Sequence, residues 1–228
     1  MNSIFYKLSF LLFPKRCGVC NDVINIRNDY CINCEKKLRR VSDYHAGIFA
    51  ENNKFFTKFT KPYFDSISAP FYLEDGSKDL IYNYKFNNRS ELKIPISSEM
   101  LTIYNSYLKN KNIDIIVGVP TMKYSKYNRG YDQVKLLSVL ISKSLGIPYI
   151  PALKQIKKKK TQHTLGSQTE RLKNVLGIYD IKNIVVKDKI ILLIDDIVTT
   201  GATVNECSKV LKKHGAKEVH VLCAAINM

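Results

Sequence analysis

Two adjacent carboxylates followed by a run of threonine and glycine form a chemically suggestive stretch of this 228-residue sequence. In IILLIDDIVTTGATVNE, residues 190–206, an apolar run leads into Asp195 and Asp196, and a helix is predicted directly after the Thr and Gly residues. Backbone N–H groups and hydroxyls at a helix start form a natural cradle for a phosphate. Paired carboxylates suit the vicinal hydroxyls of a sugar, directly or through hydrated Mg²⁺. Together, these features describe a site for a ribose 5-phosphate.

The turn after the acids carries its own predictions. Gly201 has no Cβ and so lets the backbone approach a phosphate closely, and Thr203 and Glu206 have the spacing of a capping box. A Walker B acid would require the loop G-x-x-x-x-G-K-[ST], and a dinucleotide fold would require G-x-G-x-x-G; the sequence has neither. A polar turn with a satisfied helix N-cap remains an alternative.

Four cysteines in two C-x-x-C pairs form the second constellation. They are Cys17, Cys20, Cys31 and Cys34, with ten residues between the pairs. Four thiolates at this spacing can form a closed structural zinc site, with redox dithiols or disulfides as the alternative. We expect the basic neighbours to help keep the sulfurs deprotonated; these are Lys15, Arg16, Lys36 and Lys37. Cys207 and Cys223 lie in apolar contexts and are predicted to be buried small residues.

The formal net charge of +16 favours anionic partners such as phosphorylated metabolites, nucleic acid or acidic membrane surfaces. The apolar run 8–13 near the amino terminus is too short for a signal-peptide core, and no small-residue cleavage site follows it. No stretch is long enough to cross a bilayer. We therefore expect a short amino-terminal helix that packs on its own protein, with membrane association as the alternative, and a cytoplasmic location.

Alternating strands and helices are predicted to position these residues. Helices are expected over 35–45, 75–86 and 91–108, with an irregular aromatic-rich connection at 46–70. Strand signals at IDIIVGVP, IPYIPAL, KIILLI and EVHVLCAAI then alternate with helices over 129–146 and from about Val204. This succession predicts an α/β fold, a parallel sheet with helices on both faces, whose ligands bind at the carboxyl ends of the strands.

The stretch LLIDDIVTTGAT resembles the phosphoribosyl pyrophosphate (PRPP) signature of type I phosphoribosyltransferases. The C-x-x-C pairs, VGVP, RGYDQ, TQ…ERLKNV and this signature, in that order, are similar to the ComF family of phosphoribosyltransferase-like proteins, which is associated with natural competence. Tyr131 and Asp132 stand where that family commonly has Phe-Asn. The resemblance implies a zinc-binding module at 1–45 and a phosphoribosyltransferase-like domain at 46–228, divided into a hood at 46–112 and a core at 113–228.

The resemblance also implies roles for individual residues. Asp195 and Asp196 would meet the ribose hydroxyls, directly or through Mg²⁺, and the loop from Gly118 to Lys123 would face pyrophosphate. The 5-phosphate would be held by Thr199, Thr200, Gly201, Ala202 and Thr203.

The lysine-rich segment 157–168 corresponds to the mobile catalytic loop. Lys158 and Lys159 could neutralise the leaving pyrophosphate, although a solvated loop explains them equally well. Arg129 and Arg171 are anion contacts on the family pattern or exposed charges at helix starts. No histidine has metal-like spacing, and His163 lies inside the predicted catalytic loop.

Three functions follow from these observations. The first is a Mg²⁺-dependent phosphoribosyltransferase that uses PRPP and releases pyrophosphate. The second is a PRPP-binding adaptor or regulator of DNA uptake without turnover, with competence-machinery partners such as a DNA-uptake helicase. The third is a single-stranded DNA-binding protein that uses the zinc module, the basic loop and exposed aromatic residues. No motif predicts the acceptor of the ribosyl group.

Overall fold

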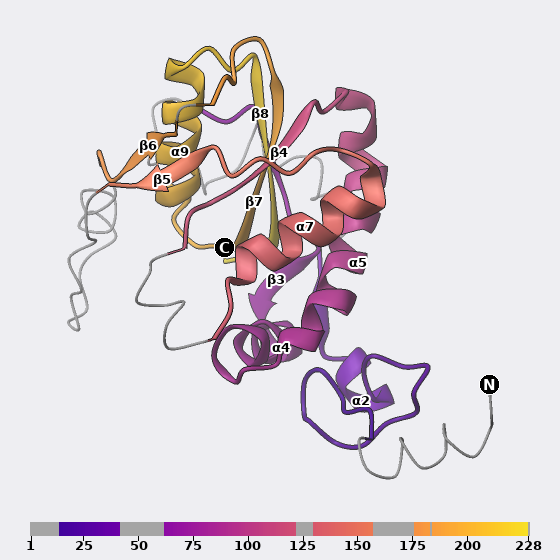
Figure 1. Ribbon diagram of the computed structural model, residues 1–228. Helices are drawn as coiled ribbons and strands as arrows, with labels where there is room; N and C mark the ends of the chain where they lie inside the picture. Colours follow the sequence, from indigo (N-terminus) through magenta and orange to yellow (C-terminus); the bar gives the residue numbers. More distant parts are fainter. Residues whose placement is uncertain (1–13, 42–61, 122–129, 157–175, 183, 228) are drawn as a thin grey trace.

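The computed structural model describes residues 14–41, 62–121, 130–156, 176–182 and 184–227 (Figure 1). The strands are β1 (Leu38–Arg40), β2 (Ser66–Ser68), β3 (Phe71–Glu74), β4 (Ile115–Gly118), β5 (Leu153–Gln155), β6 (Tyr179–Ile181), β7 (Ile190–Val198) and β8 (Glu218–Ile226). The helices are α2 (Ile32–Glu35), α4 (Asp75–Phe86), α5 (Lys93–Ile103), α7 (Gln133–Leu145) and α9 (Ala202–Lys213), with short helical turns at Ser90–Leu92, Tyr104–Leu108 and Lys109–Lys111.

The central sheet has the strand order β1-β3-β8-β7-β4, and β2 also pairs with β8. Strand β7 runs parallel to β4 and β8, and β2 and β3 run parallel to β8. Helix α9 covers one face, while α5 and α7 cover the other (Figure 1). Because both faces are covered, β7 and β8 are buried along most of their length, which explains their continuous apolar sequences. The predicted α/β fold is confirmed.

Three local predictions are wrong. Of the segment 35–45, predicted as a helix, only Glu35 is helical, as the last residue of α2; Leu38–Arg40 form β1, which pairs antiparallel with β3, and residues 42–45 lie outside the described residues. Ser66–Ser68, inside the connection predicted as irregular, form β2, which pairs parallel with β8. The segment IPYIPAL pairs with the main sheet through a single bridge between Tyr149 and Ile116, and β5 pairs with β6 in a separate ribbon. In each case long-range strand pairing overrides the local pattern.

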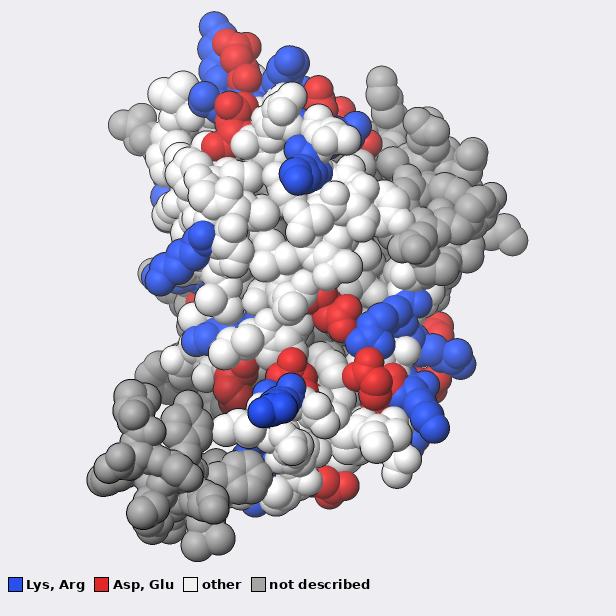
Figure 2. Space-filling view, turned by 90° about the vertical axis from the view of Figure 1, so that its right-hand side faces the viewer, with Lys and Arg blue, Asp and Glu red and all other residues white. Residues whose placement is uncertain are grey.

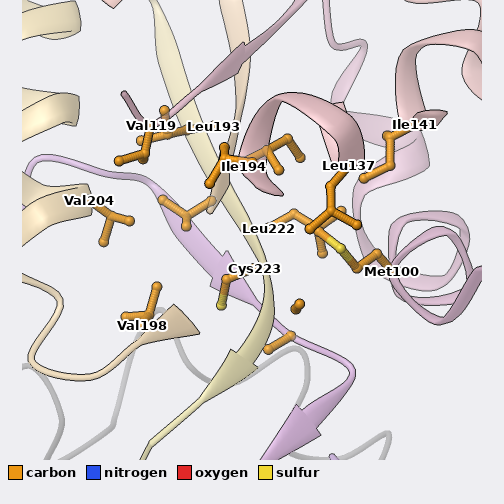
Figure 3. Close-up of a cluster of buried hydrophobic side chains, with 14 of the residues drawn as sticks. Met100, Val119, Leu137, Ile141, Leu193, Ile194, Val198, Val204, Leu222 and Cys223 are labelled. Atoms are coloured by element: carbon orange, nitrogen blue, oxygen red, sulfur yellow. The ribbon is translucent and has the colours of Figure 1, made fainter. Parts of the chain in front are cut away.

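The core fills the space between the sheet and its helices (Figure 3). Ile194 and Leu222 are paired in register on neighbouring strands, and Leu137 of α7 and Met100 of α5 lie on the same side of the sheet; all four are fully buried. Burial of large apolar side chains is the main force that holds the helices on the sheet. The two cysteines outside the C-x-x-C pairs, Cys207 and Cys223, are fully buried as predicted.

None of the helices in the described part of the chain combines the length and the apolar character that crossing a bilayer requires. The amino-terminal helix that we predict for residues 4–12 lies outside the described residues.

Candidate functional site

The four cysteines of the C-x-x-C pairs gather in the segment 14–41, which we call the cysteine module. Their sulfur atoms all lie within 4.8 Å of one another, and the Sγ atoms of Cys20 and Cys31 are 3.8 Å apart. None of the six cysteines forms a disulfide. A tetrahedron with Zn–S bonds of about 2.3 Å places its sulfurs roughly 3.8 Å apart, so the cluster fits a four-thiolate zinc site.

The backbone of the module, more than its basic side chains, favours a thiolate at Cys17. Burial raises the pKa of this thiol, but hydrogen bonds from the backbone N–H groups of Cys31, Cys20 and Val19 outweigh burial and lower the pKa to about 7. Lys15, which we expected to support the thiolates, instead forms an ion pair of 2.8 Å with Asp29. Burial contributes to a raised pKa at Cys34.

The first C-x-x-C turn is attached to helix α4. The Asn83 side-chain amide donates to the carbonyl oxygens of Gly18 and Val19, at 3.0 and 2.8 Å. A Cβ at Gly18 would lie only 3.0 Å from Leu80 of the same helix, so this turn packs closely on α4. Arg89, which follows α4, donates to the carbonyl of Cys17 at 2.8 Å. The position of the cysteine module is thus linked to the hood segment that contains α4.

The acidic pair lies inside strand β7 and not beyond its end. The strand continues to Val198, and the exposed fractions of Asp195 and Asp196 are only 7% and 8%. Successive side chains of a strand point to opposite faces. In keeping with this, Asp195 lines a pocket beside the start of α9, whereas Oδ2 of Asp196 lies 2.8 Å from Nζ of Lys85 on α4.

The pocket at the β7–α9 junction, called the β7–α9 pocket below, contains every residue of the predicted phosphate cradle. Its lining consists of Asp195, Ile197, Val198, Thr199, Thr200, Gly201, Ala202, Thr203 and Val204. The volume of about 30 Å³ exceeds the roughly 10–15 Å³ that a single water needs, so the hollow has room for more than one small polar group. The structure therefore brings one carboxylate and a helix amino terminus to the same hollow.

The predicted capping box at the start of α9 is wrong. The N-cap is Gly201, whose φ of +72° lies in the left-handed region, and Thr203 is the second residue inside the helix. Glu206 accepts a hydrogen bond from the backbone N–H of Gly177 at 2.8 Å. The carboxylate therefore ties a neighbouring loop to α9, and the glycine turn sets the direction in which the helix begins.

The carboxyl end of β4 lies next to the acidic pair. Gly118 is paired in register with Ile194, the residue before Asp195. After it, Thr121 donates to Asp132 at 2.8 Å, and Asp132 also accepts from the backbone N–H of Lys135, which caps α7. The acid that replaces the common Asn of the ComF pattern therefore acts as a helix cap in this chain.

Five of the predicted anion contacts lie outside the described residues: Lys123, Arg129, Lys158, Lys159 and Arg171. The same is true of His163 and of the whole predicted catalytic loop.

Lys85 is a site residue that sequence reasoning missed. The spacing of apolar residues in α4 predicts correctly which face of the helix is buried. Nothing in the sequence around Lys85 indicates that its partner, Asp196, lies more than a hundred residues away. The one available signal is its place beside the buried Tyr84, which puts it at the edge of the apolar face.

Of the two histidines in the described part of the chain, His220 is buried and His214 is exposed. Nδ1 of His220 lies 2.7 Å from the hydroxyl of Ser66, and Nε2 lies 2.9 Å from Glu218. Burial lowers the pKa of His220. This histidine faces Leu192 in register, three residues before the acidic pair, and so belongs to the packing of the sheet.

Comparison with known proteins gives the site a family context. Residues 92–227 match the family model of the phosphoribosyl transferase domain. "Competence protein F" of Haemophilus influenzae is 27% identical over 222 residues, which cover 92% of this chain and 96% of that protein. "DNA utilization protein YhgH" of Escherichia coli is 30% identical over 150 residues, and "Competence protein ComFC" of Streptococcus pneumoniae is 33% identical over 151. These two alignments span 63% and 66% of this chain and 64% of each relative. The resemblance to the ComF family is confirmed.

Solved structures with a related chain path include two phosphoribosyltransferases. A purine phosphoribosyltransferase from Pyrococcus horikoshii superposes with a TM-score of 0.39 at 22% identity, over 58% of this chain and 75% of that protein. An adenine phosphoribosyltransferase from Trypanosoma brucei superposes with a TM-score of 0.41 at 14% identity, over 83% of this chain and 64% of that protein.

Proposed function

The chain belongs to the phosphoribosyl transferase domain family, and we propose that it binds PRPP and Mg²⁺ at the carboxyl end of β7. The observation that carries this proposal is the β7–α9 pocket, which is lined by Asp195 together with the turn Thr199–Thr203. A 5-phosphate in the pocket would accept hydrogen bonds from the N–H groups and hydroxyls at the start of α9. The ribose hydroxyls would then lie toward the carboxylate.

The residues at this site fit Mg²⁺. The ion prefers oxygen ligands, retains several waters and commonly binds through one or two carboxylates plus substrate phosphates, which Asp195 and PRPP would supply. Asp196, the other acid predicted to act here, is paired with Lys85 and would act at one remove from the ion. When bound, the ion would neutralise charge that develops on pyrophosphate. The protein itself would bind the phosphate, orient the ribose and hold the acids in place.

We propose phosphoribosyl transfer as the activity of this site. A nucleophile would form a bond to C1 of the ribose while the bond from C1 to the pyrophosphate oxygen breaks, and pyrophosphate would leave with the bonding electrons. Positioning of the two reactants would supply much of the acceleration. Gly118 and Lys123 in the loop after β4, with Arg129, Lys158, Lys159 and Arg171, remain the proposed contacts to the anionic groups. A PRPP-binding protein without turnover would give the same affinity but no release of pyrophosphate.

We further propose that the cysteine module holds one structural Zn²⁺ through Cys17, Cys20, Cys31 and Cys34. The sulfur distances support a closed four-thiolate site, which has no open position for catalysis. In this proposal residues 1–45 form the zinc-binding module and residues 46–228 the phosphoribosyltransferase-like domain. Strand β1 of the module pairs with β3 of the domain, so the two units are expected to be stable only together.

The cellular role that we propose is cytoplasmic DNA uptake in natural competence. Relatives of this chain bear the names competence protein and DNA utilization protein. Partner proteins of the uptake machinery, such as a helicase, are part of this proposal.

Single-stranded DNA is a second candidate ligand, favoured by the net charge of +16. The cysteine module contributes less than its composition suggests, because Arg39 pairs with Asp75 and Arg40 pairs with Glu35 and Glu99. On the face shown in Figure 2, basic and acidic residues lie interspersed around a broad uncharged area. Within the described residues, the exposed Lys36 and Lys37 are the better candidates on the module.

Calorimetry with PRPP, with and without Mg²⁺, tests the proposed function. We expect wild type to bind and the double variant Asp195→Asn/Asp196→Asn to lose about 2 kcal/mol or more, since charge-assisted contacts are lost. Asp188→Asn is the matched control, because this acid is exposed in a left-handed turn before β7 that Asn also tolerates. Equal affinity in wild type and the double variant contradicts the site assignment. Release of pyrophosphate with a panel of bases then separates transfer from binding alone.

A further inference from the structure

The ion pair between Lys85 and Asp196 connects helix α4 to the proposed PRPP site. Nζ of Lys85 lies 2.8 Å from Oδ2 of Asp196, and the two side chains are only 21% and 11% exposed. The other oxygen of Asp196, Oδ1, accepts from the backbone N–H of Ile197 at 2.7 Å. Both oxygens of Asp196 therefore have protein partners, while its neighbour Asp195 lines the β7–α9 pocket.

Hydrogen bonds fix the helix that presents Lys85. The hydroxyl of the fully buried Tyr84 donates to the carbonyl of Gln133 at 2.7 Å, and the Gln133 amide donates back to the carbonyl of Lys85 at 3.2 Å. Tyr131 donates from its hydroxyl to the carbonyl of Tyr84. The end of α4 is thereby joined to the start of α7, and Lys85 is held at a defined distance from β7.

Charge explains why this ion pair bears on ligand binding. PRPP is a polyanion, and two adjacent buried carboxylates at its site would repel it. A cation within 3 Å of one carboxylate largely cancels that charge, and the effect is stronger where water is excluded. A buried carboxylate that loses its partner is left uncompensated.

We propose that Lys85 is a positioning residue for PRPP. Lys85 acts through Asp196, because it holds this carboxylate in place and cancels its charge. The two acids then differ: Asp195 serves the ligand in the pocket, and Asp196 joins the site to the hood helix. This inference rests on the proposed function, and it assigns to that site a residue outside the PRPP signature.

The test measures PRPP affinity by calorimetry over a range of Mg²⁺ concentrations in wild type, Lys85→Met, Lys85→Arg and Lys78→Met. At limiting Mg²⁺ we expect Lys85→Met to bind about tenfold more weakly, because the uncompensated Asp196 repels the ligand. The difference should narrow as Mg²⁺ rises, since the metal ion replaces the missing positive charge. Lys85→Arg should restore most of the affinity. Lys78→Met is the matched control, because Lys78 is on the same helix but exposed.

Thermal unfolding without ligand supplies a second measurement. Lys85→Met should lower the Tm, and adding Asp196→Asn to it should recover part of the loss, because the unpaired charge is removed. If Lys85→Met does not fold, Lys85→Gln replaces it, since this variant keeps a donor and removes the charge.

The outcomes separate the inference from the proposed function. A wild type that does not bind PRPP overturns both. A wild type that binds, with Lys85→Met indistinguishable from Lys78→Met at every Mg²⁺ concentration, overturns the inference alone. The same holds if Lys85→Met weakens binding equally at low and high Mg²⁺, because that pattern indicates a structural defect and not a missing charge.

Discussion

The cysteine module and the β7–α9 site both gather side chains that can carry negative charge, but the two sites stabilise such charge differently. In the module, four sulfurs approach within 4.8 Å, and backbone N–H groups stabilise one thiolate. At the β7–α9 site, one carboxylate is paired with Lys85 of a distant helix and the other lies at a helix amino terminus. In our proposal the first arrangement requires a metal ion to hold its four thiolates together, whereas in the second the charged side chains are held by the sheet and its helices.

This difference has consequences for stability. Strand β7 and helix α9 are anchored by the apolar core, so the β7–α9 site should keep its shape without a ligand. The cysteine module has only a small apolar interior of its own, and modules of this size commonly fold only with metal. We therefore expect metal to determine whether the module folds, and PRPP to fill the pocket without changing the fold around it.

Loss of one zinc ligand should give the largest effect. Cys34→Ser should release the metal and unfold the module, and it should lower the free energy of unfolding by several kcal/mol. Because Tyr30 and Leu38 of the module belong to the main core, the remaining domain should also be less stable. Metal analysis and thermal unfolding measure both effects. Cys207→Ser, in α9, is the control and should retain about one zinc per chain; loss of zinc in both variants would contradict the assignment.

The two acids of β7 should differ when they are replaced singly. Asp195→Asn should weaken PRPP binding about tenfold or more and change stability little, because this side chain faces the pocket. Asp196→Asn should destabilise the unliganded protein by about 1–3 kcal/mol, because it leaves Lys85 without its partner in a poorly hydrated place. Calorimetry measures the PRPP affinity of each variant, and urea unfolding measures its free energy of unfolding. If the two variants lose the same amounts of both, the acids are equivalent and the predicted difference is wrong.

Replacement of Gly201 tests whether the pocket depends on the shape of its turn. Gly201→Ala should cost about 1 kcal/mol in stability, because Ala is strained at a φ of +72°. It should also weaken PRPP binding, since the N–H groups of the turn are displaced. Gly146→Ala at the end of α7 is a close control, with a φ of +69° and open space around the new Cβ. Its cost in stability should be similar, with PRPP affinity unchanged.

The smallest effect is expected for DNA. Lys36→Glu/Lys37→Glu should weaken single-stranded DNA binding a few-fold at low salt and reduce the dependence on salt by about one or two ions. PRPP affinity should stay the same, because the module lies away from the pocket. Lys213→Glu/Lys217→Glu, two exposed lysines at the end of α9 and before β8, is the control with the same change in charge. Equal losses in both variants would assign the effect to net charge and not to the module.

Local patterns predicted what depends on neighbours in the chain. The C-x-x-C spacing predicted the sulfur cluster, because all four cysteines lie within eighteen residues, and the signature at β7 contains most of the residues that line the pocket, because this lining is nearly consecutive. The continuous apolar runs of β7 and β8 likewise predicted buried parallel strands.

Long-range pairing accounts for what could not be predicted. Strand β1 has the basic sequence LRR, which favours a helix, and becomes a strand only because the edge of β3 is available. Glu206 has the spacing of a cap but binds Gly177, which is 29 residues away. Lys85 has a partner 111 positions further along the chain. In all three cases the deciding contact is invisible in any short window of sequence.

A crystal structure of the protein with PRPP and Mg²⁺ tests the central claim most directly. The account predicts density for a phosphate group in the β7–α9 pocket, hydrogen-bonded to the turn Thr199–Thr203, with the ribose toward Asp195 and the ion pair between Lys85 and Asp196 intact. An empty pocket at a saturating PRPP concentration, or PRPP bound elsewhere on the molecule, would contradict it.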